Sequence, residues 1–421
     1  MANVFKQEHP KGLYLLFFVE MWERFSYYGM RALIVLYMVQ SLMFSTQKAG
    51  TIYGLYTGFV YLTPLIGGFL ADRYFGQRKC ITAGAVLMSA GLFTLAFAPK
   101  TLFLFALFLM VLANGCFKSN ISSVLGLLYG NDNNRKDSAF TVFYMGINLG
   151  AFLSPLICVS IAVKFGFEYG FAAAGCGMLI GLIVYKLYEN KLLGDKGLKP
   201  LKVKQEDTVK DGSVQNLFAL VILMLFTIPF WICFEQAGSS LTLFAEYQTD
   251  RSFLGHEIPA GYFQSLNPLF IITLAPLMSL LWEFLREKSC EPSSVTKFAI
   301  ALFLMSLAYL VMTIAGSQAG EVSALWLAGV YFIMTISELC LSPIGLSLVS
   351  KLAPKKYLSL TMGCWFLTSF FGNGLAGFLG GKYEEVSHGK LFAAFGILSF
   401  SAFILLLFCI PYVNKIMKNQ K

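Results

Sequence analysis

The segment GLYLLFFVEMWERFSYYGMRALIVLYMVQSL, residues 12–42, has the length and the apolar content of a helix that crosses a lipid bilayer. Charge inside such a helix is costly and usually serves a function. Polar and charged side chains nevertheless recur here every three or four residues, which on a helix places them on one broad face. These side chains are Glu20, Glu23, Arg24, Tyr27, Tyr28 and Arg31. That face is expected to point into the protein and away from lipid.

The composition extends this interpretation to the whole chain. Hydrophobic residues make up 57% of the 421 residues and charged residues only 13%, which excludes a water-soluble globular protein. The apolar runs lack the alternating pattern of an outer-membrane barrel, so we expect an all-α membrane protein. Twelve runs are long enough to span a bilayer: 13–42, 50–71, 80–98, 101–129, 138–163, 168–188, 216–247, 260–284, 295–315, 322–350, 358–381 and 389–413.

The basic residues predict the orientation of these helices. Of the 32 Lys and Arg, 23 fall on the side that holds both termini, six on the other side, and Arg24, Arg31 and Lys118 within the spans. Because cytoplasmic loops are enriched in Lys and Arg, both termini are expected in the cytoplasm. We therefore expect a multi-pass protein of the plasma membrane, in bacteria the inner membrane. The net charge of +9 indicates topology and not nucleic-acid binding.

A polar break divides the twelve spans into two groups of six. It predicts an N-terminal bundle at residues 1–188, a cytoplasmic linker at 189–215 and a C-terminal bundle at 216–421, the organisation of a two-bundle transporter. His9, His256 and His388 lie in or near predicted loops, and the nine cysteines form no C-x-x-C pair. Neither a metal site, a cofactor nor an enzyme is therefore expected.

Three stretches of the sequence resemble motifs of a known family and of its superfamily. The stretch from Gly68 to Lys79, GFLADRYFGQRK, is similar to a loop signature of the major facilitator superfamily. The stretch from Glu20 to Gly29, EMWERFSYYG, matches every fixed position of the E-x-x-E-R-F-x-Y-Y-G motif of proton-dependent oligopeptide transporters. Phe143 to Gly150, FYMGINLG, resembles that family's F-Y-x-x-I-N-x-G signature.

The resemblance implies the major facilitator fold, with two differences from many bacterial members. Such members carry two more helices between the bundles, whereas residues 189–213 are polar and too short to add them, so we expect twelve helices in two six-helix bundles. Ser119 stands where members commonly have proline after the lysine, here Lys118. This difference can alter the helix geometry around Lys118 but not the charge of that residue.

The chemistry of a zwitterionic peptide matches the charged residues of the spans. A general peptide site needs opposite charges at a fixed separation and loosely shaped pockets between them. Arg24, Arg31 and Lys118 supply positive charge, and Glu338 supplies negative charge. By resemblance, Arg24 and Lys118 should meet the ligand carboxylate, and Glu338, Asn148 and Asn267 its ammonium group. Tyrosine and tryptophan side chains can form amphipathic walls that accept many peptide side chains. The remaining residues expected at the site are Tyr27, Tyr28, Tyr61, Tyr144, Ser342 and Trp365.

Proton coupling is expected to use carboxylates, since no histidine lies within a span. Glu20 and Glu23 beside Arg24 form one cluster, and the sequence leaves open which of them carries the proton. The resemblance adds the pair Lys118 with Glu338, and a gate pair of Arg31 with Glu235. An ion pair that joins two bundles can hold a gate shut, and protonation of its carboxylate weakens that attraction.

These observations predict a proton-coupled symporter of di- and tripeptides that works by alternating access as a monomer in the lipid bilayer. The expected driving force is the proton gradient, with no cofactor. Two alternatives keep the same fold: a transporter of nitrate or another small anion, which would not need Glu338, and a peptide sensor that does not transport. A membrane enzyme would need a nucleophile or a metal cluster, and the sequence shows neither.

Overall fold

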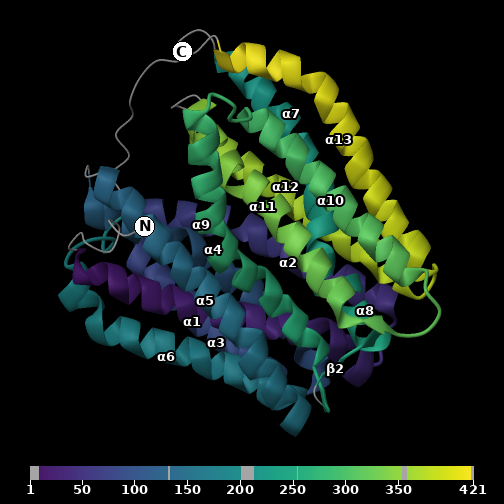
Figure 1. The fold of residues 1–421 in the computed structure, drawn as a ribbon. Coiled ribbons are helices and arrows are strands. Elements are labelled where there is room, and N and C mark those ends of the chain that lie inside the picture. Colours follow the sequence, from purple (N-terminus) through teal and green to yellow (C-terminus); the bar gives the residue numbers. More distant parts are fainter. Residues whose placement is uncertain (1–8, 131–132, 201–212, 254, 353–357, 419–421) are drawn as a thin grey trace. The chain divides into compact units, whose positions relative to one another are not determined.

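The structure is a computed structural model that describes residues 9–130, 133–200, 213–253, 255–352 and 358–418. Almost all of this part is helical (Figure 1). It forms two compact units, one of Met1–Met43 and Phe59–Lys204, the other of Phe44–Gly58 and Gln205–Lys421. The prediction of an all-α protein is confirmed. The domain boundaries drawn from the sequence stay a prediction.

The first unit is built around α1, which packs against α5 and α6, while α3 packs against α4 and α6. The apolar runs of the sequence form its helices because helical backbone satisfies its own hydrogen bonds in lipid. Its elements are α1 (Lys11–Leu36), η1 (Tyr37–Ser41), the second part of α2 (Thr46–Leu70), η2 (Ala71–Phe75), α3 (Gln77–Phe97), η3 (Lys100–Leu102), α4 (Phe103–Tyr129), α5 (Asn133–Phe165) and α6 (Phe167–Leu193).

In the second unit α10 packs against α11 and α13, and α7 packs against α12 and α13. Figure 1 shows α13, in yellow, running along α10. The unit also contains the first part of α2. Its other helices are α7 (Ser213–Phe234), η4 (Glu235–Gly238), α8 (Ser240–Tyr247), η5 (Ala260–Ser265), α9 (Leu266–Glu287), α10 (Ser294–Gly316), α11 (Ala324–Leu352), α12 (Leu358–Gly380), η7 (Gly381–Tyr383) and α13 (His388–Lys418).

Ten helical segments of the described chain are long and apolar enough to cross a membrane. Neither α1, which contains Glu20, Glu23, Arg24 and Arg31, nor α12 is among them. Length and composition therefore support a multi-pass membrane protein. The predicted number of twelve spans is not established by these two criteria. The sixth helix also extends to Leu193, past the expected end at residue 188.

The seventh span differs most from its predicted form. Residues 216–247 are predicted as one helix, but η4 interrupts it with a tighter turn between α7 and α8. Distant tyrosines bind the carbonyl groups near the break: the Tyr309 hydroxyl donates to Cys233 at 2.6 Å and the Tyr331 hydroxyl to Ala237 at 3.3 Å. An interrupted membrane helix needs hydrogen-bond donors for its freed carbonyl groups. The two tyrosine hydroxyls supply them and so stabilise the break.

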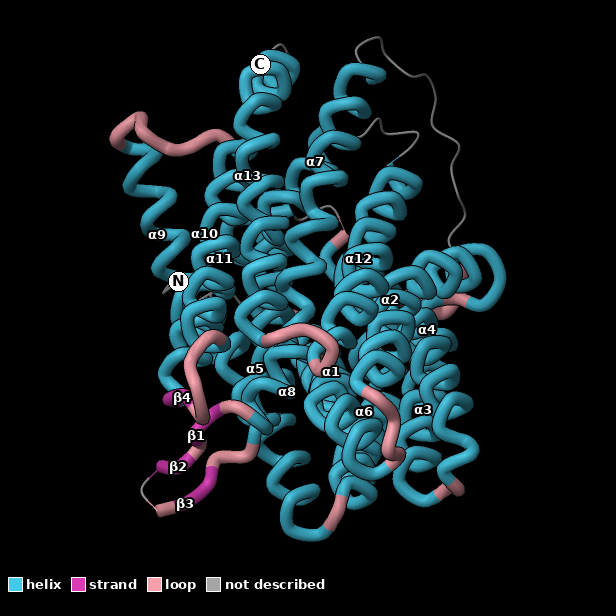
Figure 2. The backbone as a smooth tube through the Cα atoms, turned by 90° about the vertical axis from the view of Figure 1, so that its right-hand side faces the viewer, coloured by secondary structure: helices cyan, strands magenta, loops and turns pink. Residues whose placement is uncertain are grey.

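Four short strands were not predicted, and they lie at one end of the second unit near α8 (Figure 2). Strand β1 (Thr249–Asp250) pairs in parallel with β4 (Val322–Ser323), and β2 (Ser252–Phe253) pairs antiparallel with β3 (His256–Glu257). Arg251 stands between the two pieces. Its guanidinium contacts Glu246 at 3.2 Å and Glu257 at 2.7 Å. The ion pairs of Arg251 with these two carboxylates thus stabilise the loop that contains β1, β2 and β3.

The superfamily-like loop of the first unit is anchored by Arg78. The Arg78 side chain is buried and donates to Glu189 at 3.1 Å, to the carbonyl of Gly194 at 2.8 Å and to Asn190. The nearby Asp72 accepts a bond from Gln77 at 2.7 Å. Arg78 therefore fixes the start of α3 to the end of α6, and its partner Glu189 is a buried helical residue where a polar break was expected.

A charged cluster joins α9 to α10, with Glu291 in the loop between the two helices. Glu291 accepts hydrogen bonds from Arg286 and Lys297, each at 2.7 Å. Hydrogen bonds from Arg286 and then Lys297 lower the pKa of the Glu291 carboxyl from its ordinary 4.5 to about 2. A lowered folded-state pKa means that the pair stabilises the fold above the unfolded pKa, and that this contribution is lost as the pH falls toward 2.

We expect Glu291→Gln to lower the free energy of unfolding at pH 7 by roughly 1 kcal/mol, a modest amount because Arg286 is largely exposed. The difference between parent and variant should shrink between about pH 4.5 and pH 2. The stability difference is measured from the unfolding midpoints of parent and variant in detergent at several pH values. Glu287→Gln, at the exposed end of α9, is the control. A difference that stays constant down to the lowest pH would contradict the expectation.

Candidate functional site

The charged face predicted on the first helix forms a buried cluster in α1. Arg24 makes a two-point ion pair with Glu23, in which Nη2 donates to Glu23 Oε1 at 2.7 Å and Nε to the other oxygen. Arg24 Nε also lies 3.2 Å from Glu20 Oε1. All three side chains are at most 5% exposed. Charges this deeply buried are tolerated only when paired, so their mutual contacts explain why the helix can hold them.

The two carboxylates of the cluster are not equivalent. Glu23 uses both oxygens on the Arg24 guanidinium. Glu20 uses Oε1, whereas its buried Oε2 has no hydrogen-bond partner among the described residues. Lys118 on α4 lies close enough to interact electrostatically with Glu20. The structure therefore brings Glu20, Glu23, Arg24 and Lys118 into one group within the first unit.

Two motif glycines, whose role the sequence did not reveal, place α5 directly against this cluster. A Cβ atom on Gly150 would lie 2.2 Å from the Met21 carbonyl oxygen and 3.1 Å from Arg24 Cβ. A Cβ atom on Gly29 would lie 2.6 Å from Cys158 Sγ of α5. Real Cβ atoms do not approach so closely, so only glycine permits this crossing of α1 and α5. The close crossing brings Asn148 of α5 alongside the charged helix.

Aromatic rings accompany each basic side chain of the predicted site. Arg24 lies over the Tyr27 ring at 5.4 Å, Arg31 over Tyr28 at 5.7 Å, and Lys118 over Tyr61 at 4.2 Å. Each distance is within the range of a cation–π interaction. Basic groups held in this way keep their positive charge in a defined position. These tyrosines are therefore part of the charged arrangement as well as candidate walls of a pocket.

Helix α4 runs without interruption through Lys118 and Ser119. The Ser119 hydroxyl donates to the carbonyl of Pro64 in α2 at 3.1 Å, and the Asn120 amide donates to that of Gly67 at 3.3 Å. The serine that replaces the commoner proline therefore leaves the helix intact and ties α4 to the second part of α2. On α5, Asn148 donates to the carbonyl of Tyr144 at 3.0 Å, and Tyr144 is exposed.

In the second unit the structure joins Asn267 of α9 to Glu338 of α11. The Asn267 amide donates to Glu338 Oε2 at 2.9 Å and to the Thr335 hydroxyl oxygen at 3.1 Å. Thr335 was missed by the sequence analysis, although it lies three residues before Glu338 and hence on the same helix face. Both Asn267 and Glu338 are half-buried. In the second unit, two of the predicted site residues are therefore joined directly by a hydrogen bond between an amide and a carboxylate.

The remaining predicted residues of this unit have different surroundings. Trp365 is only 4% exposed and packs against Phe298, with its ring where a Cβ of Gly345 would be. Ser342 has a buried hydroxyl with no hydrogen-bond partner among the described residues. Glu235 is buried at the first position of η4. The packing of Trp365 favours a structural contribution, and its contact with ligand stays a prediction.

The predicted pairs Lys118–Glu338 and Arg31–Glu235 each join a residue of the first unit to a residue of the second. They stay predictions, as do the roles of the individual binding residues. Within the units, however, some predicted residues are found together: Glu20, Glu23, Arg24 and Lys118 in the first, and Asn267 with Glu338 in the second. The cationic side chains of Arg24 and Lys118 lie in the first unit beside Glu20 and Glu23, and the carboxylate of Glu338 with its amide partner lies in the second.

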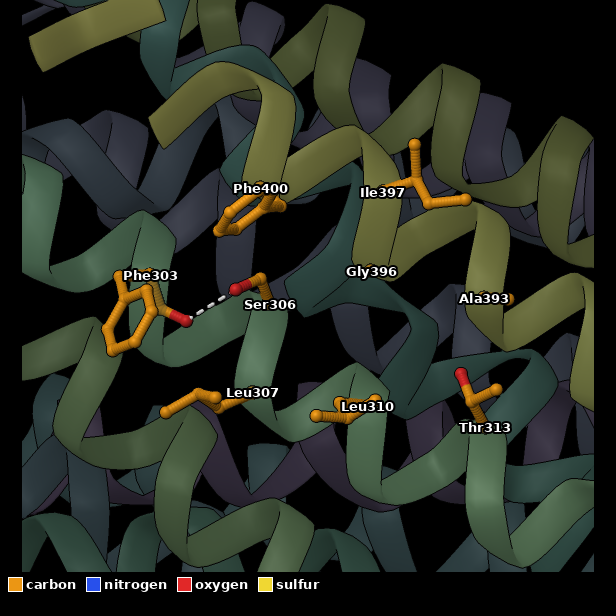
Figure 3. Close-up of a pocket in the computed structure, with 9 residues that line it drawn as sticks. All are labelled: Phe303, Ser306, Leu307, Leu310, Thr313, Ala393, Gly396, Ile397 and Phe400. Carbon is orange, nitrogen blue, oxygen red and sulfur yellow. Dashed lines mark hydrogen bonds between the residues drawn. The ribbon is translucent and has the colours of Figure 1, made fainter. Parts of the chain in front are cut away.

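An apolar groove between α10 and α13 lies apart from these residues (Figure 3). It has a volume of about 320 Å³. The hydroxyls of Ser306 and Thr313 in its wall donate to the carbonyls of Phe303 and Tyr309, each at 2.7 Å, so their protons are already engaged. Its lining contains none of the predicted site residues. Within the described residues no three His, Cys, Asp or Glu side chains gather as a metal site either.

A fold of membrane-length helices with paired buried charges is typical of a membrane transporter. The family profile of the POT family matches residues 78–199 and 196–396. The chain belongs to the POT family. Its members and the relatives below are transporters, which excludes the membrane-enzyme alternative.

Two relatives match along nearly the whole chain. Peptide transporter YePEPT of Yersinia enterocolitica is 34% identical, with 98% of this chain and 96% of the relative covered. The di-/tripeptide transporter of Lactococcus lactis subsp. lactis is 30% identical, with 100% of both chains covered.

Solved structures agree with the fold. A peptide transporter POT in complex with sulfate has a TM-score of 0.91 and 32% identity, covering 97% of this chain and 96% of that one. A POT family transporter in complex with a thioalcohol conjugated peptide has a TM-score of 0.90 and 29% identity, covering 96% and 97%. The all-α architecture is thus of the major facilitator type.

Proposed function

We propose that this chain is a proton-coupled symporter that imports di- and tripeptides by alternating access. The observation that carries the proposal is the placement of the cationic side chains of Arg24 and Lys118 in the first unit and of the carboxylate of Glu338, bonded to Asn267, in the second. A zwitterionic peptide presents a carboxylate to one group and an ammonium to the other. The printed names of both relatives, and the peptide complex of the related transporter, support the same substrate class.

The geometry of Arg24 suggests how it meets a ligand. Its Nε and Nη2 atoms are engaged by Glu23. The planar guanidinium presents a second edge, formed by Nη1 and Nη2, on which a carboxylate can be bound at two points. We assign this edge to the peptide carboxylate, with Lys118 as the second cation. Glu338 and Asn267, together with Asn148, would hold the ammonium end.

The unequal carboxylates of α1 favour Glu20 over Glu23 as the proton carrier. Both oxygens of Glu23 are engaged in the two-point pair with Arg24. Glu20 has one contact, and a buried carboxylate oxygen without a donor is costly until a proton neutralises it. Proton binding at Glu20 and Glu338 and peptide binding then act on the same conformational equilibrium, as coupled transport requires.

The surroundings of the protein follow from the same proposal. The chain would act as a monomer in the plasma membrane, in bacteria the inner membrane, with twelve spans and no additional inter-bundle pair. The charge bias of its loops supports cytoplasmic termini. The proton gradient would supply the driving force without a cofactor.

Proteoliposomes with an imposed pH gradient test the proposal. Labelled dipeptide should accumulate only when the outside is more acidic, and unlabelled di- and tripeptides should compete with it while nitrate and free amino acids do not. Competition by nitrate would favour the anion-transport alternative. Saturable peptide binding without accumulation would favour a sensor.

A further inference from the structure

We propose that Thr335 is a positioning residue whose hydroxyl fixes the orientation of the Asn267 amide, so that the amide oxygen accepts a hydrogen bond from the ammonium group of a bound peptide. The inference rests on the proposed function and deepens it, because it names an atom that meets the peptide amino terminus. Thr335 is fully buried in α11, whereas Asn267 and Glu338 are half-buried. Thr335 is therefore placed to act through Asn267 and not on the peptide itself.

The Thr335 hydroxyl can have only one role toward Asn267. It donates its single hydrogen to the Tyr331 carbonyl oxygen at 2.7 Å, and a carbonyl oxygen can only accept. The Thr335 oxygen is thereby left as an acceptor. The group of Asn267 that lies 3.1 Å from this oxygen must therefore be a donor, which is the amino group Nδ2.

Both hydrogens of this amino group are then assigned. One is directed to the Thr335 oxygen and the other to Glu338 Oε2 at 2.9 Å. The other end of the Asn267 amide is the oxygen Oδ1, which can only accept, and an ammonium group can only donate. In this orientation the amide offers the peptide amino terminus a matching partner. A reversed amide would turn its own N–H groups toward the ammonium group.

The threonine is needed most when Glu338 is neutral. An ionised Glu338 can only accept, so it would hold the Asn267 amide in the same orientation by itself. A protonated Glu338 also carries an O–H group, which can donate to Oδ1 of a reversed amide. Under the proposed function Glu338 takes up a proton during transport, and the charge that attracts the ammonium group is then lost. Thr335 keeps Oδ1 of Asn267 available for the ammonium group in that state.

Equilibrium binding of dialanine to Thr335→Val tests this role, because valine keeps the shape of threonine and removes the hydroxyl. In the parent background the loss of affinity should be about threefold, since ionised Glu338 still orients the amide. In the Glu338→Gln background, where glutamine can donate or accept, the same substitution should weaken binding about tenfold or more. Thr335→Ser keeps the hydroxyl and should stay within about twofold of threonine in both backgrounds. A loss in the Glu338→Gln background no larger than that in the parent would overturn the proposal.

Two comparisons separate positioning from a general effect on packing. In the Asn267→Ala background, Thr335→Val should have no further effect on dialanine binding, because the amide through which it acts is gone. Thr227→Val is the control, since Thr227 is also fully buried and donates to a carbonyl, that of Met224 at 2.8 Å. It should change the affinity less than about twofold in every background. A loss from Thr335→Val that persists without Asn267 would show a structural role and contradict positioning.

Propionyl-alanine, which is dialanine without its amino group, tests which end of the peptide is concerned. In the Glu338→Gln background, Thr335→Val should weaken binding of dialanine about tenfold and that of propionyl-alanine less than about twofold. Equal losses for the two ligands would exclude Oδ1 as a partner of the ammonium group. Thermal unfolding verifies that each variant is folded, and Thr335→Ala, which also lacks the hydroxyl, replaces valine if that variant is not.

The same measurements distinguish the inference from the proposed function. If the parent binds no dialanine, the proposed substrate class fails and the inference fails with it. If the parent binds dialanine and the Thr335 variants bind it equally well in both backgrounds, only the role of Thr335 fails.

Discussion

Glu338→Gln is expected to abolish proton-driven accumulation of peptide, while exchange of peptide across the membrane persists with weaker binding of its ammonium group. The glutamine keeps the shape of the side chain, and its carbonyl oxygen can still accept the bond that Asn267 donates at 2.9 Å. It loses only the charge and the ability to bind a proton. One pH unit is worth about 1.4 kcal/mol per proton, so about tenfold accumulation per unit of gradient should disappear.

Two assays test this expectation. Uptake under an imposed pH gradient measures proton-driven accumulation, and counterflow without a gradient measures peptide exchange. Glu283→Gln is a matched control in the same unit, since Glu283 is exposed on α9. The control should behave like the parent in both assays. If Glu338→Gln still accumulates dipeptide in response to pH, Glu338 does not couple the proton.

Arg24→Ala is expected to weaken peptide binding by about 10- to 100-fold, the equivalent of about 1.5–3 kcal/mol for hydrogen bonds to a charged group. The variant also leaves Glu20 and Glu23 buried without their cation, which should lower stability. Arg24→Lys separates the two effects, because lysine keeps the charge but cannot form the planar two-point bond. It should retain stability better than it retains affinity.

Equilibrium binding of a dipeptide, with thermal unfolding measured on the same preparation, tests the arginine. Arg251→Ala provides the comparison, since Arg251 also contacts two carboxylates, Glu246 and Glu257, but in the strand-containing loop. Its removal should affect stability without a comparable loss of affinity. A stable Arg24→Ala protein that binds dipeptide like the parent would exclude Arg24 as the carboxylate anchor.

Helix positions were largely predictable from the sequence, whereas their interruptions were not. The predicted span 295–315 corresponds closely to α10, because a run of apolar residues in lipid has no alternative to helix. The break at Glu235–Gly238 was missed, since its hydroxyl partners Tyr309 and Tyr331 lie far away in the sequence. The pairing of β1 with β4 was missed for the same reason.

The charged residues of the candidate site were predictable because charge inside a membrane helix is rare. Their local partners were not. Thr335 gives no compositional signal, and the packing of Trp365 against Phe298 depends on how two distant helices meet. Gly29 and Gly150 are fixed positions of the sequence motifs. The close helix contact that they permit is seen only in the structure, where α1 packs against α5.

The crossing of α1 and α5 at these two glycines has a consequence for protein engineering. Because the helices touch through their backbones, Arg24 and Asn148 are mounted on a single stiff platform whose spacing no side-chain substitution can easily adjust. Directed evolution toward new cargo should therefore leave Gly29 and Gly150 unchanged and vary side chains with free volume around them. Exposed Tyr144, on the same platform, is the first position for such a library.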